Sequence, residues 1–454
     1  MTGIEIFGIP FEFALFAATL LGVALFHDRT LQVAATGLAA VILYKLLASG
    51  FHGHPGVSGL LAHLHAEWVV LANLFALLMG FALLSRHFEE SHVPGHLPAL
   101  LPDDWKGGFV LLVLVFVLSS FLDNIAAALI GGTVAATVFH RRLHIGYIAA
   151  IVAASNAGGS GSVVGDTTTT MMWIDGVSPL NVLHAYVAAG VALVVCGVFA
   201  SRQQQAFSPI QQSDEERAPV DWVRVGVVAF ILLSAIGVNV LTNVQYPELS
   251  ARFPFIGAAV WGALLLGAIW RRPDWSVLPS TLRGTTFLLC LVLSASLMPV
   301  ERLPAASWQT AFGLGFVSAV FDNIPLTKLA LEQGGYDWGM LAYTVGFGGS
   351  MIWFGSSAGV AITNLFPDAR SVGGWLRGGW HVALGYVAGF AVLMLTLGWQ
   401  PHAPHKPPLP LAGEVAQRAG EGSLPLPSTG EVAQRAGEGS LPLPFAGEVA
   451  RQGG

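Results

Sequence analysis

"SNAGGSGSVVGDTTTTMMW" spans residues 155–173 and lies between strongly apolar segments. The stretch combines glycines, serines and threonines with one aspartate, Asp166, in a chain that is 54% hydrophobic and 11% charged. Soluble domains carry about 25% charged residues, so this composition predicts an integral membrane protein. Glycine in a helix interior costs about 1 kcal/mol relative to alanine. The stretch therefore predicts a break in a transmembrane helix.

Apolar segments long enough to cross a bilayer, about 17–25 residues each, recur along the chain. They cover residues 7–26, 31–50, 67–86, 145–174, 179–200, 221–243, 254–270, 282–300, 338–366 and 376–398. Two further apolar segments, 108–139 and 306–331, are interrupted midway by Asp-Asn. Irregular backbone at membrane depth persists only where it is buried in protein or lines a cavity. We interpret both segments as re-entrant hairpins with Asp-Asn near the tip.

The order of these segments is the same in the two halves of the chain: three spans, a hairpin, an interrupted span and a span. Each half then makes five crossings, so the second half enters from the opposite face. The predicted fold is an all-α polytopic membrane protein, an inverted repeat of two five-span halves, each with a re-entrant hairpin and a broken helix. The first repeat covers residues 1–200 with its broken helix at 145–174, and the second covers 221–398 with its broken helix at 338–366.

The remaining segments are a predicted cytoplasmic linker and a tail. The linker covers residues 201–220. Residues 399–454 contain GEVAQRAGEGSLPLP twice, are rich in proline and glycine, and have no apolar face to stack. We expect this repetitive tail to be disordered.

Lysine and arginine fall mostly on one face in this topology, thirteen against four. The positive-inside rule makes that face cytoplasmic and predicts both termini on the periplasmic side of the cell inner membrane. The first 26 residues lack Lys and Arg, which favours a retained first span over a signal peptide. Cys196 and Cys290 lie in separate apolar segments and are expected to be unpaired.

Three carboxylates fall at membrane depth, where an ionisable group costs about 3 kcal/mol or more. They are Asp123, Asp166 and Asp322. Asp123 and Asp322 occupy matching places, each followed by Asn and Ile. A purely structural interpretation makes each of these two residues the cap of a hairpin helix. The functional interpretation places them in a cation site.

A Gly-Ser-rich break follows each hairpin, at 158–168 and 346–357. An unwound turn exposes carbonyl oxygens, and such oxygens suit a hard monovalent cation. Close helix packing is the alternative, but it does not explain Asp166. The predicted first site is Asp123, Asn124, Asn156, Ser160, Asp166 and Thr167, and the predicted second site is Asp322, Asn323, Ser350 and Ser356. Because a desolvated carboxylate takes up a proton readily, the same oxygens can hold H⁺ or Na⁺ but not both.

These segments resemble the NhaD-type sodium/proton antiporters, in an ion transporter superfamily that also holds citrate, dicarboxylate and arsenite carriers. The resemblance covers roughly residues 65–398 and rests on the opening stretch, FLDNIAAALI, FDNIPLTKLAL and GFGGSMIWFGSSAGVAI. Asn156 to Gly159, Gly165, Asp166 and Thr168 to Met171 match the family pattern. Val163 replaces an expected proline, and Gly161 replaces a usually large residue. The resemblance implies hairpin tips that meet broken helices, two cation sites, and homodimers with a fixed scaffold domain and a moving transport domain.

The predicted function is sodium/proton antiport by alternating access, with Na⁺ and H⁺ as transported ions, no cofactor, and membrane lipid but no nucleic acid as a partner. The alternative is cation-coupled citrate or dicarboxylate transport. Carboxylate carriers in the superfamily have Ser-Asn-Thr at the hairpin tips, whereas Asp at both tips would repel citrate. Lys328 is the one cation near a hairpin, and it either pairs with Asp322 or extends to the surface.

Enzymatic and metal-binding functions are less favoured. An intramembrane aspartyl protease needs Gly-x-Gly-Asp, whereas residues 163–166 read Val-Val-Gly-Asp. His52, His54, His63 and His65 form a cluster without Cys or Asp, so we predict no metal site. A second group of histidines, on the predicted cytoplasmic side, includes His144 and could sense pH.

Overall fold

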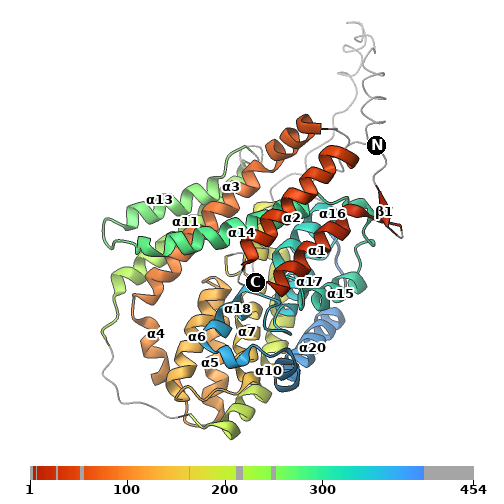
Figure 1. Ribbon diagram of the computed structural model, residues 1–454. Helices are drawn as coiled ribbons and strands as arrows, with labels where there is room; N and C mark the ends of the chain where they lie inside the picture. Colours follow the sequence, from red (N-terminus) through yellow and green to blue (C-terminus); the bar gives the residue numbers. More distant parts are fainter. Residues whose placement is uncertain are drawn as a thin grey trace, which may run out of the picture. The chain divides into compact units, whose positions relative to one another are not determined.

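The computed structural model describes residues 4–6, 8–26, 29–51, 56–162, 164–210, 218–246 and 252–402. Within these residues the regular structure is almost entirely helical (Figure 1). A short antiparallel pair, β1 (Glu5–Ile6) and β2 (Ile9–Pro10), precedes the first helix. The predicted all-helical class is therefore correct apart from this two-stranded pair.

The helices of the first half lie within or close to the predicted apolar segments. They are α1 (Phe11–Leu25), α2 (Thr30–Tyr44), α3 (Gly56–Glu89), α4 (Val93–His96), α5 (Trp105–Ser119), α6 (Asn124–Val138), α7 (Ile145–Ser160), α8 (Thr167–Ile174), α9 (Pro179–Leu183) and α10 (Ala185–Phe207). A π-helical turn, Lys45–Ser49, continues α2, and a 3₁₀ turn, Leu97–Leu100, follows α4.

The second half repeats this order of long and interrupted helices. Its helices are α11 (Trp222–Gln245), α13 (Phe255–Gly267), α14 (Leu278–Ser296), α15 (Trp308–Ser318), α16 (Asn323–Gln333), α17 (Trp338–Gly348), α18 (Ser357–Leu365), α19 (Val372–Gly378) and α20 (Trp380–Thr396). Single 3₁₀ turns lie at Trp275–Val277, Val300–Arg302 and Pro367–Ala369.

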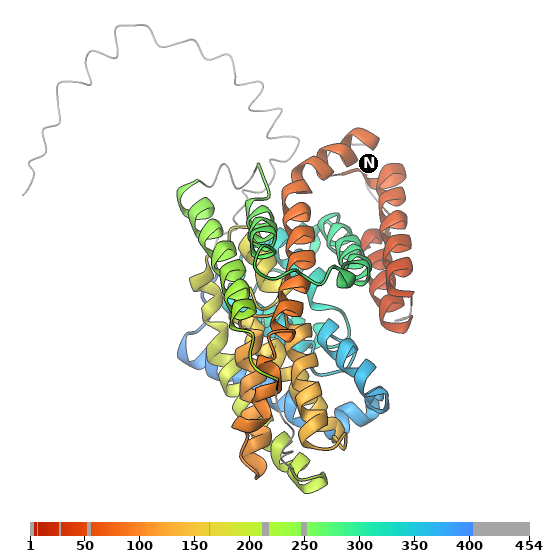
Figure 2. The same cartoon turned by 90° about the vertical axis from the view of Figure 1, so that its left-hand side faces the viewer.

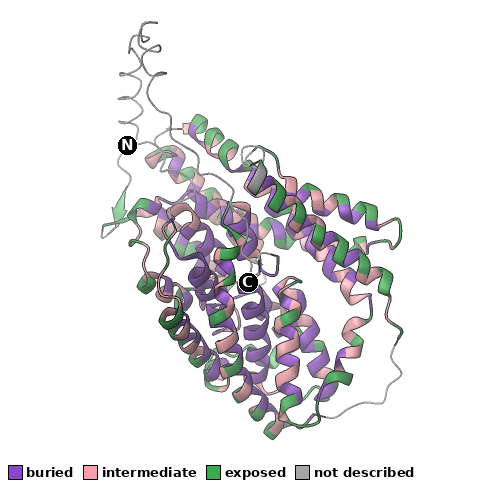
Figure 3. Cartoon of the chain, turned by 180° about the vertical axis from the view of Figure 1, so that it is seen from behind, coloured by how far each residue is buried: buried purple, intermediate pink, exposed green. Residues whose placement is uncertain are grey.

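The chain has the character of a multi-pass membrane protein. Five described helical segments are long and apolar enough to cross a bilayer: Thr30–Ser49, Gly56–Glu89, Pro179–Phe207, Trp222–Thr242 and Trp275–Ser296. A sixth is available if α19 and α20, which meet at a 59° bend, form one span. Many large apolar residues are exposed, including Leu25, Leu47 and Trp270, and such side chains suit contact with lipid. Figure 3 colours the exposed parts of the helices green.

The helices sort into two groups by their packing. One group holds α1, α2, α3, α11, α13 and α14, and the other holds α5 to α10 with α15 to α20. Figures 1 and 2 show α3 running beside α11 and α14. The second group interleaves the two halves of the chain, because α6 packs against α18, α16 against α8, and α7 against α17.

Four breaks between consecutive helices lie in the segments where the sequence predicted interruptions. Their bounds differ from those of the glycine-rich sequences. They separate α5 from α6, α7 from α8, α15 from α16, and α17 from α18. Gly158 and Gly159 remain inside α7, so the expected unwinding begins only at residue 161. A side chain at Gly158 would meet the Phe116 carbonyl of α5, and one at Gly348 would meet the backbone of Gly315 in α15. These glycines therefore serve close packing as well as the breaks.

The predicted linker and tail are only partly described. Helix α10 continues to Phe207, so the first residues of the predicted linker are helical, and residues 211–217 lie outside the described part. At the start of the tail, the Gln400 N–H donates to Asp337 and the His402 N–H donates to the Tyr336 carbonyl. Residues 403–454, which carry the repeats, lie outside the described residues.

Candidate functional site

Four helices begin at the interruptions, and a side chain caps each of them. The capping residues are Asp123 for α6, Asp166 for α8, Asp322 for α16 and Ser356 for α18. Each side chain accepts a hydrogen bond of 3.0–3.3 Å from a backbone N–H in the first turn. Asp123 and Asp322 therefore cap the helices that follow them, α6 and α16, as the structural interpretation expected. A single cap uses only one carboxylate oxygen, which leaves the other oxygen for a further partner.

The second carboxylate oxygen differs between Asp322 and Asp166. Asp322 Oδ2 accepts a 3.3 Å hydrogen bond from the Ser357 hydroxyl. Asp166 is 2% exposed, and its Oδ2 is buried without a hydrogen-bond partner among the described residues. The neighbouring Thr168 hydroxyl is likewise buried and unpartnered in this part of the chain. Asp166 thus offers an oxygen that burial has removed from water, with the Thr168 hydroxyl as its neighbouring polar side chain.

Asn156 connects the first hairpin to the second broken helix. Its Oδ1 accepts a 3.1 Å hydrogen bond from Asn124 Nδ2. Its Nδ2 donates to the hydroxyls of Ser350 and Ser356 at 2.9 and 3.1 Å. The Asn156 side chain is fully buried, so these three bonds satisfy most of the capacity of its amide.

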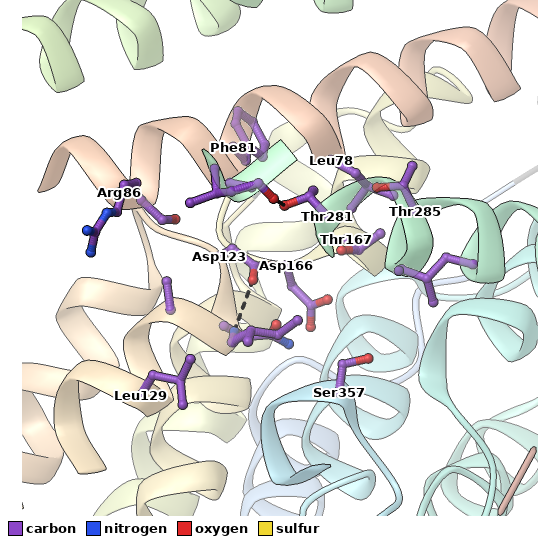
Figure 4. Close-up of a pocket in the computed structure, with 18 of the residues that line it drawn as sticks. Leu78, Phe81, Arg86, Asp123, Leu129, Asp166, Thr167, Thr281, Thr285 and Ser357 are labelled. Carbon is purple, nitrogen blue, oxygen red and sulfur yellow. Dashed lines mark hydrogen bonds between the residues drawn. The ribbon is translucent and has the colours of Figure 1, made fainter. Parts of the chain in front are cut away.

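A cavity of about 320 Å³ opens beside these capped termini (Figure 4). Its polar wall is formed by the hairpin tips and the broken helices, namely Asp123, Asn124, Asp166, Thr167, Asn323 and Ser357. Residues of α3 and α14 form much of the remaining wall, including Leu78, Phe81, Thr281 and Thr285. A second cavity, of about 550 Å³, is lined by Asp322 and Ser357 together with residues of α1 and α14.

The structure gathers all ten predicted site residues around this region. Five of them line the first cavity: Asp123, Asn124, Asp166, Thr167 and Asn323. The rest are connected to it: Asn156, Ser350 and Ser356 by the amide network, Asp322 through Ser357, and Ser160 by lying with Asp166 around Gly346. Ser357 also lines the first cavity but was not among the predicted site residues, although it follows Ser356 as Thr167 follows Asp166.

The predicted environment of Lys328 is wrong. Lys328 is 1% exposed, so it does not extend to the surface, and its ion pairs among the described residues are with Glu67 and Glu332 instead of Asp322. Its Nζ lies 2.7 Å from Glu67 Oε2 in α3 and 2.5 Å from Glu332 Oε1 in α16. Glu67 was missed because it opens the predicted span 67–86, whereas α3 begins at Gly56 and places Glu67 within the helix.

The histidine and cysteine predictions concern residues away from the cavity. His52 and His54 lie outside the described residues. Among the residues that are described, no group of three or more His, Cys, Asp or Glu could hold a metal, and His63 contacts the Ser296 hydroxyl at 2.9 Å. Cys196 and Cys290 are unpaired, as predicted.

His144 caps α7 at the end of a predicted cytoplasmic loop. Its Nδ1 accepts a 3.1 Å hydrogen bond from the Gly146 N–H. Burial lowers the pKa of the imidazole below its usual value. Both observations favour the neutral ring.

Comparison with known proteins adds an independent observation. No family model matches the chain. Sodium/proton antiporter 1 of Arabidopsis thaliana is 28% identical over 338 residues, which cover 64% of this chain and 55% of the relative. Sodium/proton antiporter 2 of the same plant is 28% identical over 62% of this chain and 74% of its own length. The Na(+)/H(+) antiporter NhaD of Vibrio parahaemolyticus is 26% identical over 77% of this chain and 96% of its own length. The predicted resemblance to this group is confirmed, although the chain spans about half the length of the first plant relative.

Proposed function

We propose that this chain is a secondary transporter that exchanges Na⁺ for H⁺ across the cell inner membrane by alternating access, and that it is not an enzyme. The observation that carries this proposal is the buried Asp166 Oδ2, which has no hydrogen-bond partner among the described residues. A buried carboxylate without a donor needs either a cation or a proton. The similarity to several proteins named as sodium/proton antiporters supports the same function.

Competition between the two ions at one place would couple their movements. Asp123 and Asp166 line the same cavity, with the Thr167 side chain beside them. Carboxylate, hydroxyl and carbonyl oxygens are hard ligands that suit a desolvated Na⁺. Protonation removes the negative charge that holds Na⁺, so binding of one ion releases the other. Ser160 and the amide oxygens belong to the same proposed cation-binding region.

We place the remaining predicted residues, Asp322, Asn323, Ser350 and Ser356, in the same proposed cation-binding region, on the side of the second broken helix. This placement is supported by the arrangement of polar groups. Asp322 accepts a hydrogen bond from Ser357, and Ser350 and Ser356 each accept one from the Asn156 amide. This side of the region lacks a counterpart of Asp166, because Ser356 caps α18 in the way that Asp166 caps α8.

Citrate or dicarboxylate transport receives less support from the charges around the cavity. Arg86 is the one lysine or arginine among the residues that line the first cavity. It already lies 3.1 Å from Glu89, 3.3 Å from Glu90 and 3.0 Å from Asp274. A carboxylate substrate is normally held by cationic donors, whereas the polar wall here is acidic.

The finer architecture belongs to the same proposal. Residues 1–200 and 221–398 would be inverted repeats, with re-entrant hairpins at α5–α6 and α15–α16 and both termini in the periplasm. The matched packing of α6 on α18 and of α16 on α8 supports this relation. The two packing groups of helices would be the scaffold and transport domains of a homodimer.

Everted membrane vesicles with a pH-sensitive dye test the function. Addition of Na⁺ should dissipate an imposed pH gradient, and Asp166→Asn should abolish that response. Asp368→Asn, which alters an exposed carboxylate, is the matched control and should leave the response intact. A response to citrate without one to Na⁺ would overturn the proposal.

A further inference from the structure

The two broken helices align without a gap through their breaks, and the alignment holds in three dimensions. The aligned pairs are Gly158 with Gly348, Ser160 with Ser350, Gly165 with Gly355, and Asp166 with Ser356. Gly158 and Gly348 both face the backbone of the preceding hairpin helix, at Phe116 and Gly315. In this alignment, Asn156 of α7 corresponds to Gly346 of α17.

Asn156 contacts the two serines, Ser350 and Ser356, that correspond to Ser160 and Asp166 in the alignment. Its amide group donates to the Ser350 and Ser356 hydroxyls, at 2.9 and 3.1 Å. These bonds complete the acceptor capacity of Ser356 Oγ, which also caps α18, and take one of the two acceptor positions of Ser350 Oγ. The Asn156 amide N–H groups therefore supply the partial positive charge beside these oxygens, so that a protein group takes the place of a bound cation.

Gly346 leaves the equivalent position in the other half open. A Cβ built on Gly346 would lie 3.5 Å from Asp166 Oδ2 and 3.5 Å from Ser160 Cβ, so Gly346 faces the counterparts of Ser356 and Ser350. Because glycine has no side chain, it cannot donate to them as Asn156 does. Gly346 therefore supplies no side-chain donor to Asp166 Oδ2, which has no hydrogen-bond partner among the described residues.

We infer that the site takes a single monovalent cation, held at Asp166 opposite Gly346, because the Asn156 amide fills the pseudo-equivalent position. The inference rests on the proposed function and limits exchange to one Na⁺ per chain in each cycle. It differs from the two cation sites that the family resemblance implies. The position without a cation has Ser356 where the other half has Asp166, and Asn156 where the other half has Gly346.

Sodium binding to the purified full-length protein tests this inference without any substitution. Titration with ²²Na⁺ should saturate at one ion per chain with a Hill coefficient near one. Saturation at two ions per chain would overturn the inference and leave the proposed antiport standing. Absence of Na⁺ binding at neutral and alkaline pH would overturn both.

A pair of substitutions tests the role of Gly346. Gly346→Asn supplies the missing amide and should weaken Na⁺ binding about tenfold or more relative to Gly346→Ala, since a hydrogen bond to a charged group contributes about 1.5–3 kcal/mol. The alanine variant adds only a methyl group at ordinary contact distance and separates the effect of bulk from that of the amide. Equal Na⁺ affinity in the two folded variants would contradict the inference. If the asparagine variant does not fold, the binding stoichiometry of the unaltered protein decides the question.

Discussion

Replacement of Lys328 by methionine would remove the cation shared by Glu67, which is buried, and Glu332, which is partly buried. Lys328 Nζ lies within 2.7 Å of both Glu67 and Glu332, and the side chains of the two acids are 6% and 18% exposed. Methionine nearly preserves the length and apolar stem of lysine, so the change removes charge with little change in packing. The ion pair also joins α3 and α16, which belong to different packing groups.

The expected loss is large because removing one partner strands the others. Breaking a buried ion pair typically costs about 3–5 kcal/mol. Here Glu67 and Glu332 both lose Lys328, and water can solvate the partly exposed Glu332 carboxylate only in part. With about 2 °C or less per kcal/mol for a chain of this size, Lys328→Met should lower the melting temperature by about 5–10 °C.

The assay is loss of the monodisperse peak on size-exclusion chromatography after heating in detergent, at one fixed heating time because unfolding is irreversible. Glu67→Gln leaves Lys328 balanced by Glu332 and should cost less than Lys328→Met. The double variant should recover part of the loss, because only Glu332 then remains unpaired, and a double-mutant cycle measures this coupling. A melting temperature within about 2 °C of the wild type for Lys328→Met, with no coupling to Glu67, would refute the reasoning.

Two further predictions concern packing and pH. Gly165→Ala would place a methyl group against the Ser119 carbonyl and should lower stability by about 2–4 kcal/mol, whereas Gly190→Ala, which meets nothing within 4 Å, should be close to neutral; equal melting temperatures would contradict this. The folded protein favours the neutral form of the His144 ring, so the pKa of His144 is lower in the folded protein than its value of about 6.5 in the unfolded chain. Its contribution to stability is therefore present above pH 6.5 and is lost as the pH falls toward the folded pKa. His144→Asn retains a capping oxygen and should reduce the loss of thermal stability between pH 7.5 and 5.5; an unchanged pH profile would argue against this role.

The helices and their interruptions could be predicted because their signals are local. Apolar length marks the spans, and Asp-Asn inside an apolar segment marks the points where α6 and α16 begin. The capping of both helices by aspartate follows from the same short pattern. Glycine was less informative, because Gly158 lies inside a continuous helix where close packing requires it.

The partners of the polar side chains could not be predicted, because they come from distant parts of the chain. Lys328 pairs with Glu67, which is 261 residues away, and Asn156 donates to Ser350, which is 194 residues away. Periodicity and composition report which residues are polar, but not which ones are brought together by the packing of α3 and α16 on α14 and of α7 on α17. The asymmetry between Asn156 and Gly346 becomes visible only after that packing is known.

Purified protein in liposomes of defined lipid provides the most direct test of sodium/proton exchange. With a pH dye inside the vesicles, an inward Na⁺ gradient should drive proton efflux and raise the internal pH. Asp166→Asn, reconstituted at equal density, should give no Na⁺-dependent signal. Absence of Na⁺-driven proton flux in the wild type, or an unchanged flux in Asp166→Asn, would contradict the assignment of this carboxylate as the place where the two ions compete.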